Sequence, residues 1–463
     1  MLTISLSEHE RLYRWDNSGI PPDNLPYQVL STRLFRRLQR FDEQLRRQNK
    51  DVFEWHIDYV KAKQWVGVIQ LEGVRVEILP KIDAVNRKRN ETKDKKLDAR
   101  ENLLTMLSIA GNVPIRARDM ADLRRSKAPL SEHLIASFAY QLEEQLLKGP
   151  VRQYVRVEDN IGLMRGKLQF SEHIKQNHSR RDRFYCEFDE FTANNLMNQI
   201  FKFSCQKLLE LTTREKVILK LRHCLLILDD VKDTPMSIEQ LNLVSFSRQN
   251  ERYKRLFAFC KLVIEGFAPS ISSGQHACFS MLFDMNEVFE RFIAQFMKKN
   301  IPVLYQNMTV IPQAKNQKKH LLQYGIKGRL LLKPDILIEQ DNKPVLIIDT
   351  KWKALTSGVK TGRGGTGRED LYQMHAYSQR FGVKHSTLLY PYVEGEHARE
   401  FDVISECGKP SGKKICIRYV DISRRLDKQG QVRLKNELAE LVAEFLPDTL
   451  PQVACTVGGL SAN

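Results

Sequence analysis

The period of the apolar residues changes twice along this chain, and this pattern limits the fold more than any other feature of the sequence. Between residues 64 and 82 (QWVGVIQLEGVRVEILPKI) apolar and polar residues alternate on either side of a short LEG turn, which predicts a β-hairpin. From residue 97 to about 267, apolar residues recur three and four positions apart, which is typical of helices. Gly111 and Gly149 stand where helices are expected to end, and residues 154–170 are expected to be extended.

The pattern after Phe279 alternates between helix and strand. It predicts a helix at 281–300, strands at 331–340 and 344–353, a helix at 368–382 and a strand at 386–393. Such an alternation is typical of an α/β module with a mixed sheet.

A chain of 463 residues exceeds the usual size of one domain, so at least two hydrophobic cores are expected. We therefore predict an α+β multidomain protein. The expected parts are an N-terminal β-rich domain with a basic linker, a helical middle region, an α/β domain, and a C-terminal helix and tail, at 1–96, 97–279, 280–425 and 426–463. The run NRKRNETKDKK (86–96) is either a solvated linker or a basic patch for DNA.

The charge balance indicates a polyanionic partner. Lys and Arg number 73 against 56 Asp and Glu, which leaves a formal charge of +17. Nucleic acid is the commonest partner of such a chain, while an acidic protein or a membrane surface remains open. The sequence shows no signal peptide and no apolar run of the roughly 18 residues that a membrane helix needs, so we expect a cytoplasmic protein. The eight cysteines form no C-x-x-C pair, so we expect most of them to be reduced core residues and we expect no zinc site.

The two strands predicted at 331–353 form an apparent hairpin, because DNK (341–343) is a turn sequence. Asp335 begins one strand, and Asp349 follows the apolar run VLII on the other. A lone buried charge is costly, so Asp349 is expected to have a partner or a metal ion. Lys351 lies two residues further along, so its side chain is expected on the same strand face as Asp349.

Two carboxylates and an ammonium group on one face fit phosphodiester hydrolysis. The Asp pair would bind Mg²⁺ through hard oxygen ligands, and Lys351 would orient or deprotonate the attacking water. The string PD-x13-DTK resembles the signature of PD-(D/E)xK nucleases. A surface ion pair beside an edge-strand Asp would also fit these residues alone, so the neighbouring elements decide between the two interpretations.

Members of that superfamily usually carry a Glu on the helix before the first catalytic strand, and Glu287 and Glu290 are the candidates here. The apolar face of this helix is set by Met285, Val288, Phe289, Phe292, Ile293 and Phe296. Glu287 points away from that face into solvent, whereas Glu290 lies near its margin. We therefore expect Glu290 to join Asp335 and Asp349 as a metal ligand.

Gln373 and Tyr377 lie four residues apart on the following helix and share one face. This Q-x-x-x-Y arrangement resembles RecB-like members of the superfamily, where it implies a place beside the metal and DNA. Taken alone, these two residues would more simply be interpreted as Tyr377 in the core and Gln373 in solvent. Because their helix directly follows the D-x-K segment, we favour a functional role for both.

The segment GRGGTGRE (362–369) has the glycine spacing of a phosphate-binding P-loop but lacks the residues that bind phosphate and Mg²⁺ there. Arg368 and Glu369 stand where Lys and Ser or Thr are required, and a Glu there would repel phosphates. We expect no nucleotide hydrolysis by this chain itself, and we expect an Arg-containing loop beside the site that contacts the DNA backbone.

Several strings outside the catalytic hairpin resemble the McrC family, the nuclease subunits of modified-cytosine-dependent restriction systems. They occur in the family's order, as VEILPKI (76–82), GPVRQYV (149–155), MRGKL (164–168), FDEFTANNLMNQIFK (188–202) and FE (289–290). The resemblance implies that 280–425 is a PD-(D/E)xK endonuclease domain acting on double-stranded DNA. It also implies a separate hexameric, McrB-like AAA+ GTPase that recognises the DNA, and on which this chain docks, stimulating hydrolysis.

Residues 1 to about 275 are expected to do that docking, because the nuclease module is complete without them. Two other functions remain open, an autonomous RecB-like repair nuclease and a regulatory DNA-binding subunit that does not cut. The DNA modification that is recognised also stays open.

Overall fold

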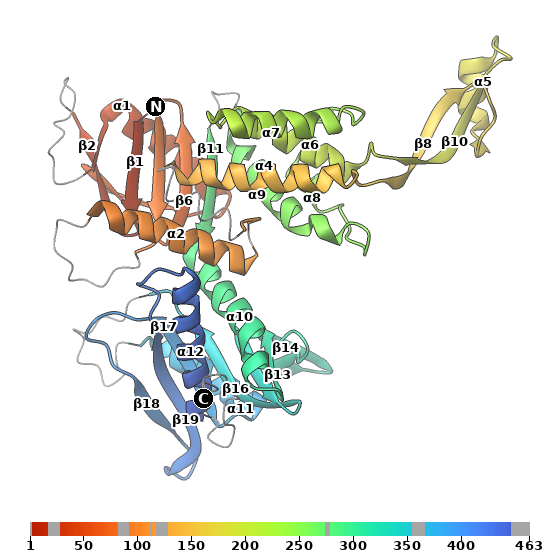
Figure 1. Ribbon diagram of the computed structural model, residues 1–463. Helices are drawn as coiled ribbons and strands as arrows, with labels where there is room; N and C mark the ends of the chain where they lie inside the picture. The colour runs from red at the N-terminus through yellow and green to blue at the C-terminus, as the bar shows by residue number, and fades with distance from the viewer. Residues whose placement is uncertain are drawn as a thin grey trace, which may run out of the picture. The chain divides into compact units, whose positions relative to one another are not determined.

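The computed structural model describes residues 2–16, 28–81, 92–111, 113–116, 128–273, 278–353 and 366–445. Helices and mixed sheets alternate along the chain, which confirms the predicted α+β class (Figure 1). The chain divides into two compact units, residues 1–111, 120–127 and 282–463 in the first, and 112–119 and 128–281 in the second. No helix in the described ranges has the length and apolar character needed to cross a bilayer.

The N-terminal part of the first unit is built on two sheets. β1 (Leu2–Ser7), β6 (Trp65–Leu71), β7 (Val74–Leu79) and β11 (Phe279–Asp284) form one, in the order β1-β7-β6-β11. β6 and β7 are antiparallel, which confirms the predicted hairpin, and every residue of β7 is buried. β2 (Arg11–Trp15), β3 (Gln28–Ser31), β4 (Phe53–Trp55) and β5 (Tyr59–Ala62) form the other, in the order β3-β2-β5-β4, beside α1 (Thr32–Arg47).

The second unit is mainly helical, as the apolar period predicted. Its helices are α4 (Leu130–Leu147), α6 (Leu196–Leu209), α7 (Glu215–Ile227), α8 (Ile238–Leu241) and α9 (Lys254–Ser273). The predicted extended interruption is β8 (Gln153–Ile161) with the short β9 (Lys167–Leu168), paired to β10 (Phe184–Thr192) beside α5 (Phe170–Asn177). We call residues 153–192 the arm, because Figure 1 shows β8, β10 and α5 extending beyond the ends of the helices of this unit.

The C-terminal part of the first unit is an α/β module. Its six-stranded sheet has the order β12-β15-β16-β17-β19-β18. The strands are β12 (Met308–Pro312), β15 (Ile336–Gln340), β16 (Lys343–Thr350), β17 (His385–Pro391), β18 (Arg399–Ile404) and β19 (Pro410–Val420). β16, β17 and β19 run parallel, and the other pairs are antiparallel, so the sheet is mixed as expected.

Helices flank this sheet, and a separate hairpin follows β12. The helices are α10 (Met285–Leu304), α11 (Arg368–Phe381) and α12 (Lys428–Phe445), and the hairpin is β13 (Lys319–Tyr324) with β14 (Lys327–Leu332). Met374 and Tyr377 of α11 pack into a core with Leu337, Ile347 and Leu388 of the sheet. This packing holds α11 over the strands that carry the candidate site.

The helix predicted at 281–300 begins later than expected. Residues 279–284 form β11, and α10 begins at Met285, where Asp284 caps it by accepting a hydrogen bond from the Asn286 backbone N–H at 2.8 Å. The apolar run from Met281 to Phe283 is buried in a sheet, and a short apolar run fits a buried strand as well as a helix.

Some of the expected features lie partly outside the described residues. Residues 86–91 of the basic run, 354–365 around the Gly-rich loop and 446–463 of the C-terminal tail are outside them. Residues 92–96 of the basic run begin α2 (Thr92–Ala110) in the first unit.

Candidate functional site

The β15–β16 hairpin places Asp335 and Asp349 at the same end of two paired strands. Ile336 is opposite Ile348, and the turn at the other end has Asp341 and Asn342 with φ values of 49° and 63°. Two left-handed residues in a row form the tight turn that suits the twist of a hairpin, and Asp and Asn adopt this conformation more readily than most residues. The predicted hairpin is confirmed, but the predicted start of its first strand at residue 331 was wrong. That strand begins at Ile336, directly after Asp335, and Leu331 and Leu332 belong to β14.

The Asp335 carboxylate is attached to the end of β16. Its Oδ2 accepts hydrogen bonds from the Thr350 backbone N–H and from the Thr350 hydroxyl, both at 2.7 Å. Thr350 directly follows Asp349, so this pair of bonds holds the two acidic residues side by side across the strands.

Asp349 is buried and paired with Lys351. Its side chain is 2% exposed, and the Lys351 Nζ lies 2.7 Å from its Oδ2. No other group in the described part of the chain donates a hydrogen bond to this oxygen. The Lys351 backbone N–H donates to the Leu389 carbonyl at 2.9 Å, which continues the attachment of this segment to β17.

Helix α11 supplies a chain of hydrogen bonds to Lys351. Lys351 Nζ donates to Gln373 Oε1 at 3.3 Å, Gln373 Nε2 donates to the Tyr377 hydroxyl at 2.8 Å, and Tyr377 donates to the Lys333 carbonyl at 3.1 Å. The two helical residues therefore reach the D-x-K segment from one face of α11. Lys333 lies two residues before Asp335, so the chain of bonds returns to the hairpin.

The two glutamates of α10 differ as their helical positions predict. Glu287 is exposed and forms an ion pair with Arg291 on the same helix. Glu290 is half-buried, and its Oε1 accepts a hydrogen bond from Gln313 Nε2 at 3.0 Å. The Gln313 backbone N–H donates to the Asp335 carbonyl at 2.8 Å, so Gln313 connects Glu290 to the β15–β16 hairpin.

Burial and nearby negative charges raise the pKa values of Asp335 and Asp349. Burial, and then the charges of Asp349 and Glu290, raises the pKa of Asp335 to about 8. Burial also raises the pKa of Asp349, although Lys351 opposes this effect. For Lys351, burial lowers the pKa, but the attraction of Asp349 outweighs it and the pKa lies above the ordinary value. The site therefore holds two carboxyl groups, of Asp335 and Asp349, whose ionisation is opposed by their surroundings, beside a lysine that stays protonated.

Asp370 is a further acidic residue of the site that the sequence reasoning missed. Its Oδ1 lies 3.5 Å from Lys351 Nζ, and its Oδ2 lies 2.6 Å from Lys353 Nζ. Asp370 is three residues before Gln373 on α11, and residues three apart share a helix face. That spacing was the available signal.

Trp352 connects the same segment to the N-terminal sheet. Its Nε1–H donates to both carboxylate oxygens of Glu8, each at 3.1 Å, and its ring packs against Phe289 with 5.4 Å between the ring centroids. Glu8 is 2% exposed and also accepts from the Lys81 backbone N–H at 3.0 Å. Burial raises the pKa of Glu8 to about 7. This long-range contact was not predictable from local patterns.

Within the described residues, no three His, Cys, Asp or Glu side chains stand together as a ready-made metal cluster. The donor set nevertheless fits a divalent cation. The charges of Asp349 and Glu290 contribute to the raised pKa of Asp335, and one oxygen of Asp349 is buried with the Lys351 ammonium as its neighbour. Hard oxygen ligands of this kind suit Mg²⁺.

Comparison with known proteins places these features in a family. Residues 60–391 match the family model described as "McrBC 5-methylcytosine restriction system component". The matched range includes every candidate site residue named above except Glu8.

A curated relative and a solved structure agree with that match. The Type IV methyl-directed restriction enzyme EcoKMcrBC of Escherichia coli K12 is 19% identical over 242 residues, which is 50% of this chain and 68% of the relative. A refined half-complex from a tetradecameric assembly of Thermococcus gammatolerans McrB AAA+ hexamers with bound McrC contains a chain with the same fold. The likeness has a TM-score of 0.63 at 22% identity and covers 95% of this chain and 100% of that one. This chain belongs to the family of McrBC 5-methylcytosine restriction system components.

Proposed function

We propose that this chain is the DNA-cutting subunit of a modification-dependent restriction complex of the 5-methylcytosine type. Residues 280–425 would be its PD-(D/E)xK endonuclease domain. The observation that carries the proposal is the buried Asp349 with Lys351 Nζ at 2.7 Å, beside Asp335 on the neighbouring strand. The family membership supports a role in DNA restriction, and the side chains support hydrolysis of a phosphodiester.

Asp335, Asp349 and Glu290 are the residues that would hold Mg²⁺. Bound there, Mg²⁺ supplies positive charge to the phosphate as negative charge develops on it. The raised pKa of Asp335, at about 8, supports this assignment, because a cation would offset the repulsion from Asp349 and Glu290 that contributes to it.

Lys351 would stabilise charge and orient the attacking water. Its pKa lies above the ordinary value, because Asp349 attracts the ammonium form more strongly than burial opposes it. A protonated amine cannot accept a proton from water, so we favour positioning over general-base catalysis. Gln373 would hold Lys351 in place, and Tyr377 would hold Gln373, through the hydrogen bonds of α11.

The partner would be a McrB-like hexameric AAA+ GTPase ring, and residues 1 to about 275 would dock on it and stimulate hydrolysis. The arm supports a docking role. Its strands, α5 and the segment between β8 and β9 expose large apolar side chains, namely Tyr154, Leu163, Met164, Phe170, Ile174 and Phe191. Exposed apolar residues gathered on one element are typical of a protein interaction surface.

An Asp349→Ala variant tests the assignment. It should abolish DNA cleavage by the complex with its AAA+ partner, GTP and Mg²⁺, while the fold and partner binding persist, because the loss of a metal ligand removes charge stabilisation at the phosphate. Glu287→Ala is the matched control, since Glu287 is exposed on α10 and pairs only with Arg291 among the described residues. Undiminished cutting by Asp349→Ala would remove this residue from the site.

The wild-type protein separates the alternatives. Cutting of DNA with Mg²⁺ but without any partner would favour an autonomous nuclease. Binding of the partner and of DNA without any cutting would favour a regulatory subunit.

A further inference from the structure

The β13–β14 hairpin lies directly before Asp335 and has no core of its own. All residues from Leu321 to Leu331 are exposed, and Ile326 at the turn is 96% exposed. A two-stranded hairpin without a covered face is only marginally stable in water. A surface of this kind is expected to be covered by a binding partner.

The charge of this segment identifies the partner's chemistry. Residues 313–333 contain no Asp or Glu and six Lys or Arg, namely Lys315, Lys318, Lys319, Lys327, Arg329 and Lys333. A row of cationic side chains with exposed apolar side chains at its tip is expected to bind a polyanion that also offers apolar surface. Duplex DNA has both, as phosphates along its strands and as base edges in its grooves.

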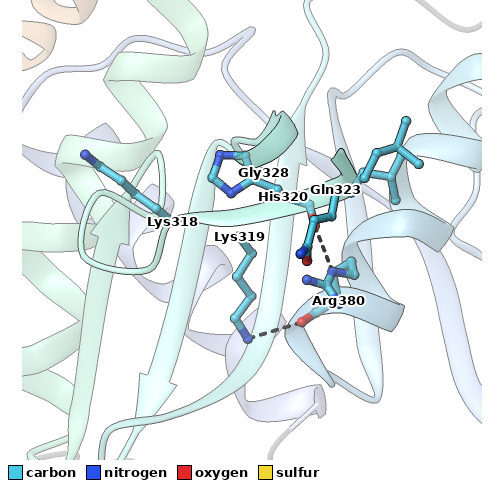
Figure 2. Close-up of a pocket in the computed structure, with 8 residues that line it drawn as sticks. Lys318, Lys319, His320, Gln323, Gly328 and Arg380 are labelled. Atoms are coloured by element: carbon cyan, nitrogen blue, oxygen red, sulfur yellow. Dashed lines mark hydrogen bonds between the residues drawn. The ribbon is translucent and has the colours of Figure 1, made fainter. Parts of the chain in front are cut away.

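A basic hollow lies at the base of the hairpin, against the end of α11. It has a volume of about 620 Å³, and its lining includes Lys318, Lys319, His320 and Arg380 (Figure 2). Lys319 Nζ donates to the Arg380 carbonyl at 3.1 Å, and Arg380 Nε donates to the His320 carbonyl at 2.9 Å. These reciprocal bonds attach the hairpin to α11, the helix that carries Gln373 and Tyr377.

Both ends of the hairpin are attached to the candidate site. At the start, Gln313 bonds to Glu290 and to the Asp335 carbonyl, and at the end the Lys333 carbonyl accepts from Tyr377. Within the hairpin, a Cβ at Gly328 would lie 2.5 Å from the His320 ring, so the His320 side chain packs closely over Gly328. A ligand held by this hairpin would therefore be held in a defined position relative to Asp335.

We propose that the β13–β14 hairpin binds the backbone of duplex DNA and holds it beside Asp335 and Asp349. The inference deepens the proposed function and rests on DNA being the substrate. The lysines and arginine contact phosphates, the hollow at Arg380 accommodates a phosphate, and the tip residues Tyr324 and Ile326 lie along a groove. A two-stranded ribbon is narrow enough to enter the major groove. A second copy of the hairpin is disfavoured as the occupant, because it would place like charges face to face.

The test uses Lys327→Ser with Arg329→Ser in the full-length chain. Both side chains are exposed, and neither has a hydrogen-bond or ion-pair partner in the described part of the protein, so the fold should persist. The probe is a fluorescently labelled 30-base-pair duplex, and binding is measured by anisotropy in EDTA at several salt concentrations. The plot of log affinity against log salt has a negative slope, and each phosphate contact adds about 0.9 to its steepness. The loss of two contacts should therefore make the slope shallower by about 2.

The matched control is Lys298→Ser with Lys299→Ser. This pair removes the same charge from exposed positions on α10, and its salt slope should equal that of the wild type. A hairpin variant with the wild-type slope, or one that changes the oligomeric state instead, overturns the proposal. The binding assay needs no cleavage, so it is distinct from the test of the proposed function. If Asp349→Ala still cuts DNA but the hairpin variant shows a shallower dependence of log affinity on log salt, DNA binding by the hairpin stands and the nuclease assignment fails.

Discussion

Replacement of Glu8 by Gln should change how the stability of this protein depends on pH. Glu8 lies buried between the Lys81 backbone N–H and the Trp352 indole, and burial raises its pKa from 4.5 to about 7. Glu8→Gln keeps the size of the side chain and removes its charge. The variant should therefore gain stability relative to the wild type as the pH rises.

The sign and size follow from proton linkage. The folded state holds the Glu8 proton more tightly than the unfolded state, so the stability from this proton is present below about pH 4.5 and is lost as the pH rises through about 7. One pKa unit corresponds to about 1.4 kcal/mol. The free energy of unfolding of the wild type should therefore fall by about 2 to 3 kcal/mol relative to the variant between about pH 5 and pH 8. The Gln side chain accepts fewer hydrogen bonds than the Glu8 carboxylate. This loss changes the free energy of unfolding of the variant by an amount that does not depend on pH.

Urea unfolding followed by tryptophan fluorescence at about pH 5, 6, 7 and 8 measures this difference. Glu72→Gln is the control, because the Glu72 side chain is 56% exposed, and its curve should run parallel to that of the wild type. A Glu8→Gln curve parallel to the wild type over this range would refute the argument that burial holds the Glu8 proton.

Three further outcomes are expected. Lys351→Ala should eliminate cleavage while stimulation of the partner's GTP hydrolysis persists, because Lys351 contacts Asp349 and α11; loss of both activities with the fold intact, checked by circular dichroism, would contradict separate roles for the two parts. Mg²⁺ should raise the melting temperature of the wild type and leave that of Asp335→Asn unchanged, since the repelling carboxylates are its expected ligands; an equal rise in both would contradict the metal assignment. Tyr154→Ser with Phe191→Ser removes two exposed rings 5.1 Å apart on the arm and should weaken stimulation of the partner's GTP hydrolysis, measured by phosphate release; wild-type stimulation would remove the arm from the docking surface.

Local patterns were sufficient to predict the elements that carry the candidate site. The hairpin depends on a turn sequence and two short strands, and the difference in exposure between Glu290 and Glu287 depends on the spacing of apolar residues on one helix. Both signals lie within a few residues of the feature they predict. The helix start at 281 was wrong, because Met281 to Phe283 have the composition of either element and the neighbouring strand decided between them.

The remaining contacts of the site join residues that are far apart in the sequence. Glu8 and Trp352 are separated by 344 positions, so nothing in either local pattern links them. Asp370 could have been found from its helical spacing to Gln373. Its contacts with Lys351 and Lys353 depend on how α11 packs over the sheet, which a single sequence does not reveal.

The two-residue turn at Asp341 and Asn342 limits which insertions and deletions this protein can tolerate during evolution. Successive side chains of a strand point to opposite faces, so a register slip of one residue in β16 would move Asp349 and Lys351 to the other side of the sheet. Insertion or deletion of a single residue in this turn could therefore inactivate the protein while leaving every residue of the site in the gene. Loops at the surface usually tolerate such changes, and this one should be intolerant of them.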